Sequence, residues 1–579
     1  MSHQQDTQIL AQFAIHRLFH NSNPESLYTE AINELTQIAK NSGPIWGVFT
    51  TIHRSPEQAL KDWPEDIHGC LGYYRINPVK SMQPRETLSQ IAGMVVGTNT
   101  TDDRRNYFKR PVEQDSGSRI EVSIMHGKLM PINPITGQIT KLGVTFDNQK
   151  FGLVVIDPKS GYSATYLPDV FPSTTSWQEL SKSLLFKAGI QLQQGGQTNT
   201  IGYQSNKVVL GQQTQKKKKL VIRTQKNQTG RNKNDSIKWF AYRTITNSCR
   251  LADYLLSPGH ALMRLSKLNS GLADLIISTA KQNPRREMPY EVQLGPNGKK
   301  KVVFDNKQYV RNISMILDMQ LVANVLTEKF LKNKSLLGRI DKPLDWISRS
   351  QYLKPFETDN ILPFADYTEL AHAAAHALGL AKLLGDKHLM VVIYDFLYTR
   401  VDAQKLEPSF EWGQVLIALI RFNPVDAGFV DMITKELGRT PALAEDDIFG
   451  TNWHIQVLVA ICKSGLDKKS AALAKLVSSK PQELATKLIN LAQRQLVSSA
   501  ETNFWAVGFE AASGLEYLIR SGGVVLGQKE QVELQNQCVS AIYNLEQRYD
   551  YRIGAYKFKD GTARLDITGH VLSGWMNLV

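Results

Sequence analysis

The 579-residue chain has only four cysteines and no long uncharged apolar run. The cysteines lie far apart and form no CxxC pair, which argues against a disulfide framework or a cysteine-rich zinc module. No stretch approaches the roughly 18 apolar residues that a membrane-spanning helix needs. The first residues also lack a basic region followed by an apolar core, so no secretory signal is expected. These absences predict a cytoplasmic protein with reduced thiols and no membrane partner.

Motifs that bind common cofactors are missing as well. The chain contains no GxGxxG, no GxxxxGK[ST] and no HExxH, which are the patterns of dinucleotide, phosphate and zinc-protease sites. The sequence therefore predicts no metal site, and it leaves any cofactor unknown.

The net charge of +14 is concentrated in one short segment. Eleven Lys or Arg residues and a single acidic residue, Asp235, lie between Lys207 and Arg243, including the run Lys216 to Lys219. Two interpretations of the run remain open, a solvated tether and a targeting or polyanion patch. Because the rest of the chain is nearly neutral, we expect no nucleic-acid partner beyond this basic linker.

The length implies more than one domain. Residues 5–200 predict an α+β domain with a mainly antiparallel sheet and flanking helices. The expected strands are 45–52, 67–74, 119–125, 150–156 and 162–166. Residues 201–235 have the Gln, Lys and Gly content of a linker. A weak hairpin signal lies at 208–222.

From residue 236 to residue 579 the pattern predicts an all-α domain with short connections. The expected helices are 310–332, 367–384, 388–400, 412–421, 452–464, 480–496, 504–519 and 529–547. One β-hairpin is expected within 290–304, because a Gly-Pro-Asn-Gly turn separates two β-rich segments.

Several short motifs in the first third occur in a recognisable order. They are Gly69-Cys70-Leu71-Gly72, Ile120-Glu121-Val122-Ser123, Thr165-Tyr166-Leu167-Pro168, Trp177 and Lys187-Ala188-Gly189. In this order and spacing the segment resembles the AMMECR1 domain. The resemblance implies the α+β fold given above. It also suggests a protein partner, because that family is associated with MEMO-type and radical-SAM-type proteins.

Cys70 is the candidate nucleophile of this segment. Flanking glycines let a ligand approach closely, and a thiol beside His68 would have a lowered pKa. The alternative is a small buried side chain next to a tight turn. Glu121 and Ser123 share one face of their strand, so Glu121 is a candidate to orient or deprotonate a neighbour. The predicted binding residues here also include Gly69 and Gly72.

Another stretch matches the family loosely. Asp103 and Arg105, with Phe108 and Pro111 after them, resemble the family's D-x-R-F and proline, and Asp103 is a candidate catalytic residue. Two departures put a family activity in doubt. His68 stands where most members have Arg, and Phe151-Gly152 stands where many have His-Gly.

The helical part resembles α/α-toroid (six-hairpin) enzymes, which include sugar epimerases and glycan hydrolases. The resemblance depends on the hairpin with Tyr290, on Arg311 at the start of a long helix, and on Arg564, Asp566 and His570 near the C-terminus. It implies a site among the inner helices, at which aromatic and acidic residues hold and protonate a sugar.

Other candidates in this part share helical spacing. His372 and His376, with Glu369 before them, lie on one helical face, and an i, i+4 His pair can also ligate a metal. Satisfied histidines in a helix interface are the alternative. The aromatic candidates for sugar binding are Trp412, Trp453 and His454. Asp395, Glu411, Glu510 and Asp566 are the carboxylates available for acid–base work.

Three functional hypotheses follow. The first is an enzyme whose helical toroid acts on a carbohydrate-like polar substrate. The second is a non-catalytic adaptor that binds a protein partner. The third is a small-molecule enzyme that uses Cys70, Glu121 and Asp103 in the AMMECR1-like domain.

Overall fold

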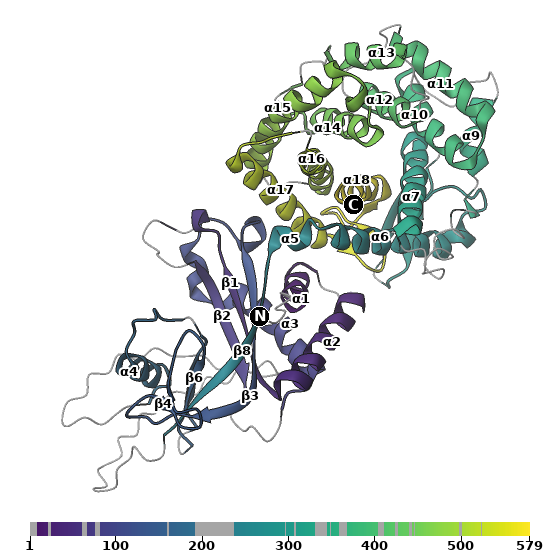
Figure 1. The fold of residues 1–579 in the computed structure, drawn as a ribbon. Coiled ribbons are helices and arrows are strands. Elements are labelled where there is room, and N and C mark those ends of the chain that lie inside the picture. Colours follow the sequence, from purple (N-terminus) through teal and green to yellow (C-terminus); the bar gives the residue numbers. More distant parts are fainter. Residues whose placement is uncertain are drawn as a thin grey trace.

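The computed structural model describes residues 8–190 and 237–579, with gaps. The gaps are 21–24, 59, 61–65, 76–80, 159–160, 169, 296, 306–307, 330–343, 345, 348, 358–366, 403–409, 423–426, 439–442, 445, 497–500 and 523. Figure 1 shows a sheet with flanking helices joined to a body of helices. This confirms the predicted fold class.

A six-stranded sheet is the centre of the first body. Its strand order is β2-β1-β3-β8-β6-β7, and every neighbouring pair is antiparallel. The strands are β1 (Ile45–His53), β2 (Ile67–Tyr74), β3 (Arg119–Pro131), β6 (Gly152–Ile156), β7 (Ser163–Tyr166) and β8 (Lys238–Arg250). The first five agree with the strands expected from alternation and β-branched content. A separate pair, β4 (Gln138–Ile139) and β5 (Val144–Thr145), forms a small ribbon.

Four helices accompany this sheet. They are α1 (Ile9–Phe19), α2 (Glu25–Ser42), α3 (Pro84–Thr101) and α4 (Trp177–Lys187). The first three pack together beside β1 and β3, whereas α4 lies against β6 and β7 (Figure 1). The start of α4 is fixed by a capping box, in which Ser176 and Glu179 satisfy each other's backbone N–H groups.

Strand β8 corrects the predicted domain boundary. The segment from residue 236 was assigned to the helical domain, yet Lys238–Arg250 lies between β3 and β6 in the middle of the sheet. Thirteen residues that were assigned to the helical domain therefore belong to the sheet of the first body. The basic linker 201–235 and the hairpin signal at 208–222 lie outside the described residues.

The inner helices of the second body contact one another in a closed cycle. The order is α7 (Tyr309–Lys329), α10 (Tyr367–Leu384), α12 (Phe410–Phe422), α14 (Ile448–Ser464), α16 (Thr502–Arg520) and α18 (Leu565–Leu578), which returns to α7. The other helices are α5 (Leu251–Leu255), α6 (Pro258–Thr279), α9 (Arg349–Glu357), α11 (Lys387–Asp402), α13 (Ala427–Gly438), α15 (Ala471–Leu496) and α17 (Gln528–Glu546). Figure 1 shows the longer of these outside the inner ones, as in an α/α toroid.

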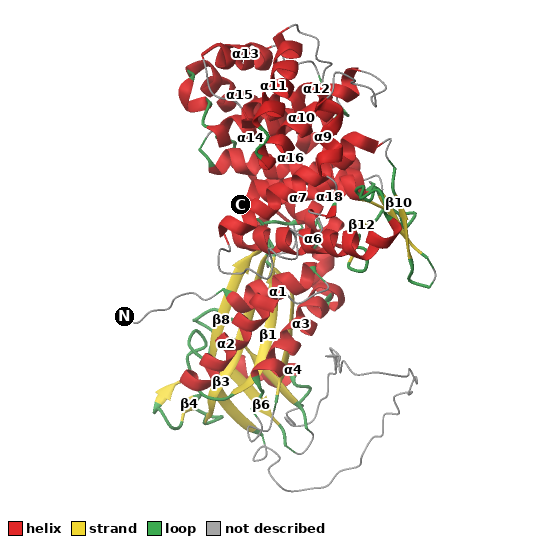
Figure 2. Cartoon of the chain, turned by 90° about the vertical axis from the view of Figure 1, so that its right-hand side faces the viewer, coloured by secondary structure: helices red, strands yellow, loops and turns green. Residues whose placement is uncertain are grey.

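Short strands close one side of this ring. The predicted hairpin is present as β9 (Glu291–Leu294) and β10 (Lys300–Val303), and β13 (Ala563–Arg564) adds a third strand beside β9. Strands β11 (Tyr549–Asp550) and β12 (Ala555–Tyr556) pair next to it. Figure 2 shows the hairpin projecting from the helical body.

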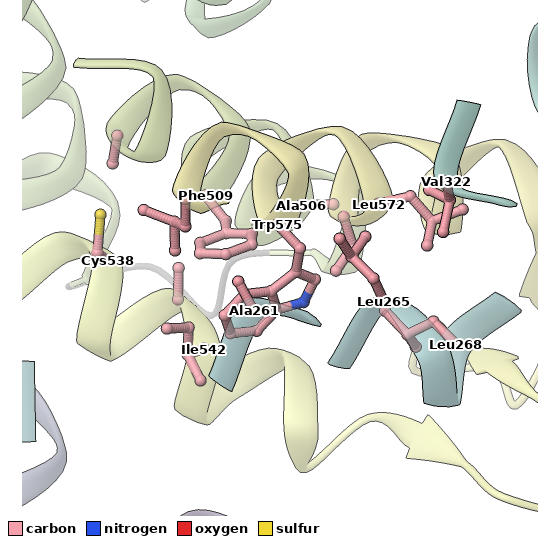
Figure 3. Close-up of a cluster of buried hydrophobic side chains, with 14 of the residues drawn as sticks. Ala261, Leu265, Leu268, Val322, Ala506, Phe509, Cys538, Ile542, Leu572 and Trp575 are labelled. Carbon is pink, nitrogen blue, oxygen red and sulfur yellow. The ribbon is translucent and has the colours of Figure 1, made fainter. Parts of the chain in front are cut away.

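One apolar core extends through both bodies. It includes Leu10 of α1, Ile124 of β3 and Trp575 of α18, all at most 1% exposed. Figure 3 shows part of it, where Trp575 and Phe509 pack above Ala261 and Leu265 of α6. Polar contacts cross the same boundary, because the backbone N–H and hydroxyl of Ser116 both donate to Asn536 Oδ1 at 2.8 Å. Within the described residues, no helix is long and apolar enough to cross a membrane.

Candidate functional sites

Cys70 and Glu121 lie in one row across the sheet. The register pairs Cys70 of β2 with Thr51 of β1, and Thr51 with Glu121 of β3, so the three side chains share a face. The Thr51 hydroxyl donates to Cys70 Sγ at 3.2 Å. Ser123 donates to Glu121 Oε1 at 3.3 Å, as their shared face predicts. The structure therefore brings three of the predicted residues close together, namely Cys70, Glu121 and Ser123.

The Cys70 thiol does not have the expected acidity. Burial raises the pKa of Cys70, which is the reverse of the predicted direction, and the hydrogen bond from Thr51 offsets only part of this effect. Lys187, the lysine of the Lys-Ala-Gly motif, acts on the Cys70 thiol through its charge, and burial lowers the pKa of Lys187. Its ammonium donates to the Thr165 carbonyl at 2.9 Å and lies 4.5 Å from the centre of the Tyr166 ring.

The carboxylate beside Cys70 belongs to Asp102 and not to Asp103. Asp102 Oδ2 accepts from the Cys70 backbone N–H at 3.1 Å and from the Arg104 guanidinium at 2.8 Å. Asp103 and Arg105 are exposed on the 3-10 turn that follows α3. Neither side chain has a contact with Cys70 in the structure.

Three of the motif residues have packing roles. His68 is 3% exposed, lies against the Phe108 ring and approaches Arg54 Nη1 at 3.2 Å. Burial and the charge of Arg54 lower the pKa of His68 to about 4. Gly72 lies under the Phe49 ring, because a Cβ there would come within 1.8 Å of it. A Cβ on Gly69 would lie 2.8 Å from the Thr98 carbonyl oxygen and 2.9 Å from the Asp102 Cβ.

In the ring, four predicted residues form one cluster at the start of α7 and α18. The Arg311 guanidinium donates to the Tyr290 hydroxyl at 3.0 Å and lies 3.4 Å from Asp566 Oδ2. Arg564 donates to both oxygens of Asp566, at 2.5 and 3.2 Å. The Arg564 guanidinium also lies 5.7 Å from the centre of the Tyr290 ring. Asp566 is therefore shared by two cations.

His570 lies one turn beyond Asp566 and pairs with Glu510 of α16. Glu510 Oε2 accepts from His570 Nδ1 at 2.7 Å and from the Asn452 amide at 2.8 Å. Burial alone would lower the pKa of His570, but the hydrogen bond and charge of Glu510 raise it. Glu510 was only one of several carboxylates that the sequence offered, and its partner could not be chosen without the fold.

Asp318 of α7 completes this group and was missed by the sequence analysis. Burial and the charge of Glu510 raise the pKa of Asp318 to about 7. Gly569 of α18 allows the close approach, because a Cβ there would lie 2.8 Å from Asp318 Oδ2. The available signal was a carboxylate within a short apolar stretch, Met315-Ile316-Leu317-Asp318-Met319.

The histidines of α10, His372 and His376, lie close enough to His570 for its charge to act on them. The two rings lie 5.2 Å apart. Burial and Arg311 lower the pKa of His372 to about 4, and burial and His372 lower that of His376 further. Both imidazoles are therefore neutral at pH 7. The side chain of Glu369 lies outside the described residues.

Most of the predicted aromatic residues are core. Trp412 and His454 are each 3% exposed, and their tilted rings contact each other with centres 4.5 Å apart, so neither presents a face to a sugar. Trp453 is 8% exposed and its ring lies 5.9 Å from that of His570. Phe449 is half-buried at 6.4 Å from the same ring. Asp395 is exposed on α11, on the outside of the ring.

Comparisons with known proteins add little. No protein-family model and no curated protein matches the chain. A solved structure described as the uncharacterised protein PH0010 from Pyrococcus horikoshii is similar, with 13% sequence identity and a TM-score of 0.24. The match covers 41% of this chain and 89% of that one. A likeness at this level carries no argument about fold or activity.

Proposed function

We propose that this protein is an enzyme that performs general acid–base chemistry on a polar, carbohydrate-like substrate within the helical ring. The observation that carries the proposal is the convergence of three titratable groups from three inner helices. Glu510 and His570 are hydrogen-bonded at 2.7 Å, and Asp318 has its pKa raised to about 7 by burial and by Glu510. Groups whose pKa values are pushed apart by one environment are typical of acid–base sites.

The proposal gives each group a role. Glu510 holds the Nδ1–H of His570, so Nε2 is the nitrogen left to exchange a proton with the substrate. Because its pKa is raised to about 7, Asp318 is suited to act as either acid or base near neutral pH. Asn452 donates to Glu510 and fixes the orientation of its carboxylate.

The neighbouring cluster supports a polar substrate. Arg311, nearly half exposed, lies between Asp566 and Tyr290 at the start of α7 and offers several N–H donors. The rings of Trp453 and Phe449 lie beside His570 and provide apolar faces of the kind that sugar rings contact. This combination of donors and aromatic faces favours a polyhydroxylated substrate over an apolar one.

The proposal is tested with a panel of neutral sugars, amino sugars and uronates, as monomers and short oligomers, incubated in deuterated buffer. NMR detects bond cleavage, epimerisation or deuterium incorporation. We expect one class to react, with a loss of about 100-fold or more in Glu510→Gln and His570→Gln. The matched control is Asp395→Asn, an exposed carboxylate on α11. If no panel member reacts, or if all variants react alike, the proposal is wrong.

We also propose that residues 8–190 with β8 form an AMMECR1-like domain. Its support is that the family's motifs meet in space, since Lys187 of the Lys-Ala-Gly motif donates to the carbonyl of Thr165. A second candidate function, chemistry at Cys70, is favoured by the row of Cys70, Thr51 and Glu121. An alkylation measurement in the Discussion tests it.

A further inference from the structure

Three buried histidines meet at the boundary between the two bodies. His16 and His20 lie at the end of α1, and His260 lies in the first turn of α6. All three are at most 2% exposed, and one ligand nitrogen from each lies within 4.8 Å of the others. This cluster is separate from the groups proposed for catalysis.

The contacts of His260 fix where its proton lies. His260 Nδ1 is 2.9 Å from the Leu255 carbonyl, which only accepts, so Nδ1 carries the hydrogen. His260 Nε2 then carries a lone pair, and it faces His20 Nε2 at 3.1 Å. His20 Nδ1 lies 2.8 Å from Glu546 Oε2, yet neither atom makes a hydrogen bond among the described residues. The close contact of the two Nε2 atoms requires either a proton on His20 Nε2 or a metal ion between them.

The third ring presents a further lone pair. His16 Nδ1 is 3.0 Å from the Tyr254 hydroxyl. Its Nε2 is buried and has no hydrogen-bond partner among the described residues. A buried nitrogen without a partner is costly, and one nitrogen of His16 lies within 4.8 Å of a ligand nitrogen of each of the other two rings.

One buried ion pair lies next to the histidines. Arg264 of α6 pairs with Glu546, and both side chains are at most 2% exposed. Lys267 also acts on His16 and His20 through its charge, and burial and Arg264 lower the pKa of Lys267 to about 8. Burial and Arg264 also lower the pKa of His260 to about 3, so its imidazole is neutral and able to bind a metal.

From this arrangement we infer that His16, His20 and His260 bind a zinc-class divalent ion through their Nε2 atoms. In a tetrahedral site with Zn–N distances of about 2.0–2.1 Å, two nitrogens lie about 3.3 Å apart, close to the separation of His20 and His260. His16 must move inward by roughly 1–2 Å to complete the set. Three imidazoles suit Zn²⁺ or Co²⁺ and leave a fourth position for water.

The second contacts of the rings match those of known metal sites. A ligating histidine usually donates its other N–H to a carboxylate or a carbonyl. Leu255 accepts such a hydrogen bond from His260, Tyr254 contacts Nδ1 of His16, and Glu546 Oε2 lies 2.8 Å from Nδ1 of His20. The bound ion would join α1 of the first body to α6 of the second.

Metal content tests the inference on the full chain, produced without a histidine tag in medium supplemented with Zn²⁺ or Co²⁺, so that the ion is present as the chain folds. We expect about one equivalent per chain by mass spectrometry and, for Co²⁺, visible absorption bands of a tetrahedral site. His388→Gln, which removes an exposed histidine of α11, should retain both signals. His16→Gln should lose them.

A milder variant covers the case in which His16→Gln does not fold. Tyr254→Phe removes only the hydroxyl on His16 Nδ1, and we expect it to weaken metal affinity about 10–100-fold in a chelator competition. Folded wild-type protein that carries no metal after both preparations would overturn the inference, leaving a proton shared between His20 and His260. Metal retained with unchanged affinity in Tyr254→Phe and His16→Gln would overturn it as well.

Discussion

The buried pair of Arg264 and Glu546 gives the sharpest test of how two helices of the second body are held together. The Arg264 side chain is 1% exposed and the Glu546 side chain 2% exposed, and the pair joins α6 to α17. The perturbation is Arg264→Met, which keeps most of the apolar stem and removes the charge. Glu546 would then be a buried carboxylate without its main partner.

Breaking a buried ion pair by removing one partner costs about 3–5 kcal/mol, because the remaining charge is not compensated. We expect the lower end, about 3 kcal/mol, since Lys267 lies one turn along α6 and also attracts Glu546. The double variant Arg264→Met, Glu546→Gln removes both charges and should lose only about 1 kcal/mol, because no buried charge remains.

The assay is urea unfolding followed by circular dichroism for the wild type, both single variants and the double variant. The double-mutant cycle then isolates the energy of the pair. A cost below about 1 kcal/mol for Arg264→Met would refute the reasoning. So would a double variant less stable than Arg264→Met, because it would show that the charge of Glu546 is well tolerated alone.

Three further outcomes are expected. The folded-state pKa of Asp318, about 7, lies above the ordinary value of 3.8. The folded state therefore binds this proton more tightly than the unfolded state, and the free energy of unfolding falls as pH rises from about 4 to about 7. Asp318→Asn should flatten this pH dependence of the urea midpoint, and an unchanged slope would contradict the assignment. In a full-length variant with Cys249, Cys462 and Cys538 replaced by alanine, the rate of Cys70 alkylation should still rise above pH 9, because burial raises its pKa; a plateau below the roughly 8.5 of a free thiol would instead support a nucleophile. The fragment 1–205 lacks β8 and should show no cooperative unfolding transition; a cooperative one would mean that the sheet forms without that strand.

The regular elements could be predicted because their patterns are local. Alternation and β-branched content located β1, β2, β3, β6 and β7 within a few residues, and helical periodicity located most of the ring. Strand β8 was missed although its aromatic and β-branched residues alternate, with Trp239, Ala241 and Cys249 buried. Because the composition becomes helical soon after this strand, the strand itself was assigned to the helical domain.

The candidate sites were only partly predictable because their members come from distant parts of the chain. Tyr290, Arg311, Arg564 and Asp566 were selected from short motifs and do meet in the structure. Asp318 and the partner of Glu510 could not be identified, because burial and proximity raise the pKa of Asp318 and neither is visible in sequence. Likewise, His16 and His20 show an i, i+4 spacing, but His260 follows 240 residues later.

The position of β8 has a consequence for biosynthesis. During translation, β1, β2 and β3 emerge long before β8, which lies between β3 and β6 in the sheet. Until β8 is made, the edges of β3 and β6 that pair with it have no strand to bond to. Helix α1 waits longer still, since its partner α17 is among the last elements to be made. Contacts this distant in sequence slow folding. The nascent chain is thus exposed to aggregation until nearly its full length is available, and we expect chaperone binding to be strongest during that interval.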